Sequence, residues 1–228
     1  MTDFKVLRNQ RSCFGGKGKW TPYKPRKVWG RLVPCAHGLH YCRDEQVMGW
    51  LDDELWQFVD LAPDDAIATP DKRVTSKGMI TEKYKTWGAE TARLLAIDCA
   101  RLAVSWVTSD ETRERLHACL DTAVGYMAGC CDNAALMSAK RLADEEFAFA
   151  MAEGGLGEDY AANAAAIAVD NVMKWSRNGE TAQEVAMAAE NAVDIAHGYD
   201  ERLSMRKEQY DLLCLYLEGE QGPFVGEE

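Results

Sequence analysis

A proline-free stretch covers residues 71–222, and it limits the fold more than any other feature of the chain. Five of the six prolines precede residue 71, and proline is the residue that most strongly interrupts a helix. From residue 87 onward, apolar side chains recur at steps of three and four, as at Leu95, Cys99, Leu102 and Trp106. Alanine rises to 27 of the last 143 residues, and alanine is the best helix former. The stretch therefore predicts a run of amphipathic helices.

Breaks in this periodicity divide the stretch into helices. Thr108 with Glu111, and Thr181 with Glu184, have the spacing of a capping box, which marks a helix start. Helix ends are predicted at Gly154, at Asn178 followed by Gly179, and at His197 followed by Gly198. The six predicted helices are residues 87–107, 110–128, 133–153, 159–177, 181–197 and 200–217. Because the connections are short, neighbouring helices should be antiparallel, as in a helical bundle or a short α-solenoid.

The first 85 residues predict a small domain with strands. Runs of β-branched and aromatic residues, which are typical of strands, occur at 4–8, 28–33 and 55–61, and also at 73–76 and 79–81. A short helix is expected at 44–52, with Asp44 and Glu45 in its first turn, and a loop at 63–70. The predicted fold class is α+β. A strand-containing domain at 1–85 is followed by an Ala-rich six-helix antiparallel bundle at 86–217 and an acidic flexible tail at 218–228.

The charge is divided between the two halves. The chain has 228 residues and a net charge of −11, but residues 86–228 carry −15. Residues 1–43 hold ten Lys and Arg and one acid, Asp3. The overall acidity argues against general nucleic-acid binding, because phosphates would repel the chain. It favours a protein partner with a basic surface for the helical half.

Membrane and secreted proteins are disfavoured as classes. There is no run of 18 or more apolar residues, so no transmembrane helix is expected. The N-terminus lacks the apolar region of a signal peptide. Eight cysteines are too dilute for a disulfide scaffold. We expect a cytoplasmic protein with reduced thiols.

A basic and aromatic segment near the N-terminus is a candidate binding site for an anion. Its candidate residues are Arg11, Lys19, Trp20, Arg26 and Trp29. Cations beside aromatic rings suit single-stranded nucleic acid or a nucleotide. The alternative is that this basic surface docks on the acidic helical half of the same chain.

A cluster of cysteine and histidine residues is a candidate zinc site. Cys35, His40 and Cys42, with Cys13 as a fourth ligand, offer the thiolate and imidazole groups that zinc prefers. The alternative is that these small side chains pack in a minor core beside a glycine turn, and we favour no metal. The motifs HExxH, GxSxG, GxGxxG and the Walker loop are absent, so no catalytic residue set follows from them.

The N-terminal half resembles a domain family of unknown function found in bacteriophage proteins. The resemblance is carried by the pattern C-x-x-G-[FL]-H-x-C, here Cys35, Gly38, Leu39, His40 and Cys42, followed by a short helix and a strand. That family has no assigned activity.

The C-terminal half is similar to the helical "putative immunity protein" family. Trp87 followed by Ala96-Ile97-Asp98-Cys99-Ala100, and a Q-x-x-L pattern from Gln209, carry this similarity. It implies binding of a partner through an acidic surface.

A third resemblance is to ADP-ribosyltransferase-like folds, carried by residues 38–42 before a helix and a strand. It implies an NAD site formed by Arg8 or Arg11, His40 with Tyr41, and Glu82. The interpretation that we carry forward is a non-enzymatic, phage-type accessory protein. Its acidic bundle would bind a macromolecule in an immunity-like or counter-defence role, with a homo-oligomer also open. A nucleotide-handling enzyme is the alternative.

Overall fold

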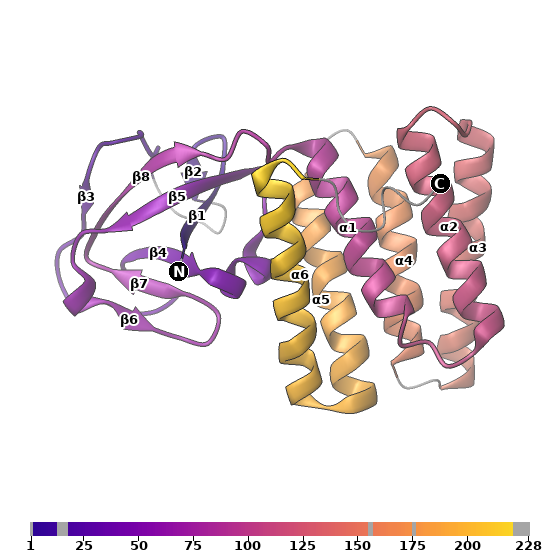
Figure 1. The fold of residues 1–228 in the computed structure, drawn as a ribbon. Coiled ribbons are helices and arrows are strands. Elements are labelled where there is room, and N and C mark those ends of the chain that lie inside the picture. The colour runs from indigo at the N-terminus through magenta and orange to yellow at the C-terminus, as the bar shows by residue number, and fades with distance from the viewer. Residues whose placement is uncertain (1, 13–17, 155–156, 175–176, 221–228) are drawn as a thin grey trace.

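The computed structural model describes residues 2–12, 18–154, 157–174 and 177–220. It confirms the α+β fold, with an antiparallel sheet in the N-terminal half and six packed helices after it. Figure 1 shows the two parts side by side, with α5 and α6 facing the strands. The predicted tail at 218–228 lies mostly outside the described residues, and so does Cys13.

The described strands form one antiparallel sheet in the order β3-β8-β5-β1-β4-β7-β6, and β2 pairs with β1. Their bounds are β1 Asp3–Arg8, β2 Arg11–Ser12, β3 Arg26–Lys27, β4 Leu39–Arg43, β5 Glu54–Asp60, β6 Ile67–Ala68, β7 Arg73–Thr75 and β8 Lys77–Lys83. Two 3-10 helices, η1 Asp44–Trp50 and η2 Pro63–Asp65, interrupt the strands. The runs of β-branched and aromatic residues thus identified β1 and β5 and the middle of β8.

Two sequence predictions for this half were wrong in detail. The strand expected at 28–33 is not formed, because pairing with β8 stops at Lys27 and Gly30 turns the chain with φ +102°. Residues 63–70 are not a plain loop, since they contain η2 and the short strand β6. The helix expected at 44–52 is present, but it is a 3-10 helix over 44–50.

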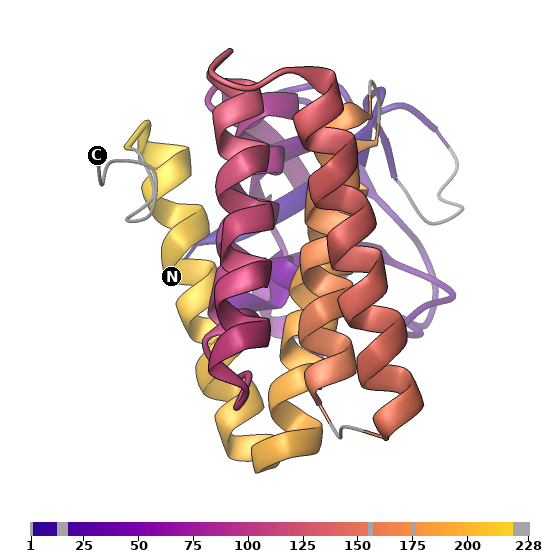
Figure 2. The same cartoon turned by 90° about the vertical axis from the view of Figure 1, so that its right-hand side faces the viewer.

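The six helices are α1 Ala89–Val104, α2 Asp110–Met127, α3 Asn133–Glu153, α4 Glu158–Met173, α5 Asn178–His197 and α6 Tyr199–Glu218. The helices pack in two layers (Figure 2). Helix α1 contacts four of the others, α2, α4, α5 and α6. Each of these helices that the structure describes is too short or too polar to span a membrane.

Both predicted capping boxes were wrong. Ser109, not Thr108, caps α2 by accepting a hydrogen bond from the Thr112 backbone N–H. Thr181 lies inside α5, because α5 begins at Asn178. The Asn178 side chain donates to the Asn171 carbonyl at 3.2 Å, so a residue that looks like a helix stop instead joins α5 to α4.

One hydrophobic core crosses the boundary between the sheet and the helices. Phe4, Val47 and Leu51 from the N-terminal half belong to the same buried cluster as Leu95 and Val185 of the helices. Because the cluster is continuous, the two halves are packed as one structural unit. A second, smaller core lies within the sheet; its members are Leu7, Trp20, Leu39, Tyr41, Trp56, Phe58 and Ile80.

Candidate anion-binding pocket

The sheet opens into a cavity between β1 and β4. These strands pair only at Asp3 with Arg43 and at Phe4 with Cys42. Beyond Phe4, β1 pairs with β2 on that side, while β4 pairs with β7 along its other edge. The separation leaves a cavity of about 660 Å³. Its walls include Lys5, Trp20, Arg26, Cys35, His40 and Lys72.

Three cationic side chains converge on this cavity. Lys5 of β1 donates a hydrogen bond to the His40 carbonyl, across the gap between the separated strands. Lys72 forms an ion pair with Asp71 at 3.0 Å, and Arg26 enters from β3. Both lysines are only 6% exposed, and buried charges are costly unless they are compensated. The described lining residues include no aspartate or glutamate, so the charged groups of the cavity wall are cationic, and Asp71 pairs with Lys72 from outside that lining.

Aromatic rings hold these cations in place. The Trp20 ring lies 4.7 Å from the Arg26 guanidinium and 5.3 Å from the Lys5 ammonium. The Trp50 ring lies 4.2 Å from the Lys72 ammonium. Such cation–π contacts are worth about 0.5–2 kcal/mol each. The rings therefore fix the positive charges and are themselves covered, so they are poor stacking surfaces for a ligand.

The loop before β4 forms one wall of the cavity. Cys35 has φ +64°, which is the left-handed region that non-glycine residues rarely occupy. Its backbone N–H donates to His40 Nε2 at 3.1 Å. Burial, and then the charges of Lys5 and Lys72, lower the pKa of His40, so its neutral ring can accept this bond. Gly38 follows with φ +141°, where a Cβ would lie 2.2 Å from Val74 Cγ1.

The proposed zinc ligands are brought together only in part. Cys35, His40 and Cys42 all line the cavity. However, the described residues contain no group of three or more His, Cys, Asp or Glu side chains placed to hold a metal ion. Cys42 is 5% exposed, and burial raises the pKa of its thiol to about 12. The structure assigns Cys42 to the core and Cys35 to the cavity wall.

The residues implied by the ADP-ribosyltransferase resemblance are separated in the fold. His40 and Tyr41 line the cavity, and the Tyr41 hydroxyl donates to Asp60 at 2.9 Å. Arg8 instead binds Asp52 and Glu180 where the sheet meets the helices. Glu82, on β8, accepts a hydrogen bond from the Tyr23 hydroxyl and is not among the described residues that line the cavity.

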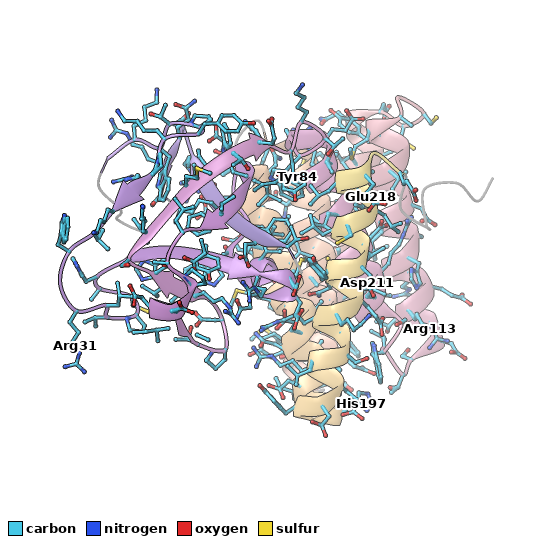
Figure 3. The ribbon with its side chains drawn as sticks, turned by 60° about the vertical axis from the view of Figure 1, so that its left-hand side comes forward. Arg31, Tyr84, Arg113, His197, Asp211 and Glu218 are labelled. Carbon is cyan, nitrogen blue, oxygen red and sulfur yellow. The ribbon has the colours of Figure 1, made fainter. Side chains whose placement is uncertain are left out.

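The five anion-binding candidates are also divided. Trp20 and Arg26 line the cavity, whereas Arg11, Lys19 and Trp29 are exposed outside it. Trp29 is 76% exposed, with the Lys27 ammonium 3.6 Å from its ring. Arg31, labelled in Figure 3, lies at the end of the molecule away from the helices. Among the basic residues of this half, Arg8 reaches the helical bundle, through Glu180.

Sequence reasoning missed Lys5 and Lys72. Lys5 lies in an alternating strand, which suggests a solvent-facing side chain, and Lys72 lies between a loop and a short strand. Their convergence depends on the opening between β1 and β4. Comparison of the chain with family models, curated proteins and solved structures gives no match.

Proposed function

We propose that the pocket between β1 and β4 binds a small phosphate-bearing ligand. The observation that carries this proposal is the convergence of Lys5, Arg26 and Lys72 on a cavity with no carboxylate among its described lining residues. Two of these cations are more than nine-tenths buried, so an anion would gain charge-assisted hydrogen bonds away from bulk water.

The size and chemistry of the cavity favour a nucleotide or a smaller phosphorylated compound. Its volume of about 660 Å³ falls in the range typical of small-molecule sites. Because Trp20 and Trp50 are covered by cations, the phosphate groups supply the recognition, and a base or sugar adds contacts at the rim. ADP-ribosyl transfer is not supported, because Arg8 and Glu82 lie elsewhere. We place this activity in the cytoplasm, where such compounds are abundant.

Calorimetry with inorganic phosphate, AMP, ATP and NAD at low salt tests the proposal. We expect at least one phosphate-bearing ligand to bind, and Lys72→Met to weaken it by about tenfold or more, the effect of losing one charge-assisted hydrogen bond. Lys140→Met is the matched control, because Lys140 pairs with Asp144 on α3, in the outer part of the bundle. Absence of heat with all four ligands would contradict the proposal.

A second candidate function concerns the outer face of α3. Met137, Phe149 and Met151 are 48%, 59% and 60% exposed there, and the exposed acids Asp144 and Glu145 pair with Lys140 and Arg141 of the same helix. Exposed apolar side chains among charged groups suit a protein partner with a polar rim. This face is where we propose that a phage-type accessory protein with an immunity-like or counter-defence role would bind its target. A second copy of the chain is the other possible occupant.

A pull-down at low salt tests the α3 face. A specific partner should be retained by the unmodified protein and by Leu203→Ser, and lost with Phe149→Ser. Leu203 is the control because it is an exposed apolar residue on α6, 43% exposed. Equal retention by both variants, or a complex that survives high salt unchanged, would show that this acidic and apolar face is not the binding surface.

A further inference from the structure

We propose that Cys35 is a nucleophile in the cationic pocket and that it undergoes thiol–disulfide exchange with small anionic disulfides. This inference rests on the proposed anion site and adds a covalent step to it. Four features of the same cavity carry it: an exposed thiol, a buried cation in the same wall, two further cations and a fixed loop.

Cys35 shares the wall of the cavity with a buried positive charge. Lys72, whose side chain is 8% exposed, lines the same cavity. The exposed thiol is therefore reached through a cavity that also contains Lys5 and Arg26. An anionic reagent drawn into this cavity would arrive next to the sulfur. Cys42 borders the same cavity, but burial keeps it protonated, with its thiol pKa raised to about 12.

The loop that carries Cys35 is held by both histidines of the cluster. His40 Nε2 accepts the Cys35 backbone N–H at 3.1 Å, and His37 Nε2 contacts the Trp29 carbonyl at 2.9 Å. Each histidine therefore uses its Nε2 atom to hold this loop in the wall of the cavity. Neither imidazole is hydrogen-bonded to the sulfur among the described contacts, so neither is placed as its general base or acid.

This arrangement selects the class of electrophile. Without an acid placed to protonate a leaving group, Cys35 suits a reaction whose leaving group departs readily as an anion, and a thiolate does so. The step is Cys35–SH + RS–SR′ → Cys35–S–SR + R′SH. The Cys35 sulfur attacks one disulfide sulfur, the S–S bond breaks, and the proton of Cys35 ends on the released thiol. The small disulfide is the oxidant, and its carboxylate or phosphate groups bind the three cations.

Competition between two alkylating reagents tests the role of the pocket. Iodoacetate is anionic and iodoacetamide is neutral, but both react with thiols by the same displacement. Peptide mass spectrometry gives the rate of each reagent at each cysteine in the folded, full-length protein. We expect the iodoacetate-to-iodoacetamide rate ratio at Cys35 to exceed that at Cys130 by about tenfold at low salt, and the excess to disappear at high salt. Cys130 is the internal control, because it is exposed in the turn between α2 and α3.

Lys72→Met should remove most of this excess, whereas Lys140→Met should leave it unchanged. If Lys72→Met fails to fold, the salt dependence of the unmodified protein and protection of Cys35 by inorganic phosphate still decide the matter. Equal ratios at Cys35 and Cys130 in low salt would overturn the inference, and so would an unchanged ratio across salt concentrations.

The disulfide itself is tested with dithiobis-nitrobenzoate, a dianionic aromatic disulfide, and with neutral hydroxyethyl disulfide. The unmodified protein should form the mixed disulfide at Cys35 faster with the dianion, and Cys35→Ser should remove only that adduct. The two proposals fail separately. Calorimetric binding of phosphate ligands without selective reaction at Cys35 would refute the covalent step alone. Selective reaction at Cys35 without such binding would refute the phosphate ligand and leave the nucleophile.

Discussion

Arg8 of β1 and Glu180 of α5 form an ion pair of 2.7 Å across 172 residues of sequence. The same guanidinium lies 2.8 Å from Asp52, whose side chain is 2% exposed. Arg8 therefore compensates a buried carboxylate and joins the sheet to the bundle through one side chain. Its pKa is raised by its hydrogen bonds and charges toward Asp52 and Glu180, which outweigh the opposing effect of burial.

Arg8→Met should lower the free energy of unfolding by about 2 kcal/mol, because it leaves the Asp52 carboxylate buried without its cation. Chemical denaturation measures this change. Arg141→Met is the control, because Arg141 and Glu145 are both exposed on α3 and 3.8 Å apart, and such surface pairs contribute little. Equal effects of the two variants would show that Arg8 is not needed for docking.

Gly179 of α5 packs directly against the backbone of residue 52. A Cβ at this position would lie 2.3 Å from the Asp52 carbonyl oxygen. Alanine inside a helix is normally more stable than glycine by about 1 kcal/mol. Gly179→Ala should instead destabilise the protein by about 1–3 kcal/mol, because the backbones of α5 and residue 52 must move apart.

Gly49→Ala is the matched control for Gly179→Ala. Gly49 lies in η1 near the same junction, but a Cβ there would meet nothing within 4 Å. Thermal unfolding should show a lower midpoint for Gly179→Ala and an unchanged or higher midpoint for Gly49→Ala. If Gly179→Ala were as stable as the unmodified protein, the tight packing of α5 on residue 52 would be disproved.

The sequence predicted the helices far better than the pocket, and the reasons are physical. Helix periodicity is local, so α3 was predicted at 133–153, with its end at Gly154, from neighbouring residues alone. Asn178 and Gly179 were misread because their roles are tertiary: one binds Asn171 and the other packs on residue 52. A local pattern of Asn followed by Gly cannot distinguish a helix stop from a close contact.

The pocket could not be predicted from the sequence, because it too depends on tertiary contacts. Lys5 and Lys72 meet only because β1 leaves β4 after two residue pairs. Trp20 and Arg26 could be predicted as candidate binding residues from the sequence, because basic and aromatic residues are close together in that segment. Which of the basic residues face the cavity, and which lie outside it like Trp29, depends on the path of residues 18–38 around the sheet edge.

Stability should fall as the pH is lowered through the range below the ordinary histidine value of 6.5. The pKa of His40 is lowered in the folded protein, by burial and then by Lys5 and Lys72, so the unfolded chain binds protons more readily. The stabilising contribution is complete above the unfolded value and is lost as the pH falls toward the folded value. His40→Gln keeps an acceptor for the Cys35 N–H but cannot be protonated. Its unfolding free energy, measured by denaturation from pH 7.5 to 5.5, should vary less with pH.

His117→Gln provides the comparison for His40. Burial also lowers the pKa of His117, which lies on α2, so this variant should reduce the pH dependence as well. Only His40→Gln, however, should change anion binding in the pocket. If His40→Gln keeps the full pH dependence of the unmodified protein, the half-buried His40 ring is not held in its neutral state.

Substitutions at Glu190 and its arginine partners show whether this buried ion-pair network stabilises the bundle. The alternative is that stability depends only on leaving no buried charge without a partner. The Glu190 side chain is 1% exposed, and Arg206 of α6 donates to it at 2.9 Å, with Arg202 at 3.3 Å. Arg206→Met removes a main partner of a buried carboxylate and should lower the free energy of unfolding by about 3 kcal/mol.

The double variant Glu190→Met with Arg206→Met should recover part of that loss, because no unpaired buried charge remains and Arg202 keeps its ion pair with Asp194 at 3.1 Å. Lys207→Met, which removes an exposed pair with Asp211, should leave stability unchanged. Denaturation of the four variants, Glu190→Met included, gives the coupling energy. A double variant that is less stable than either single variant would mean that the network itself, and not the avoidance of an unpaired charge, holds α5 to α6.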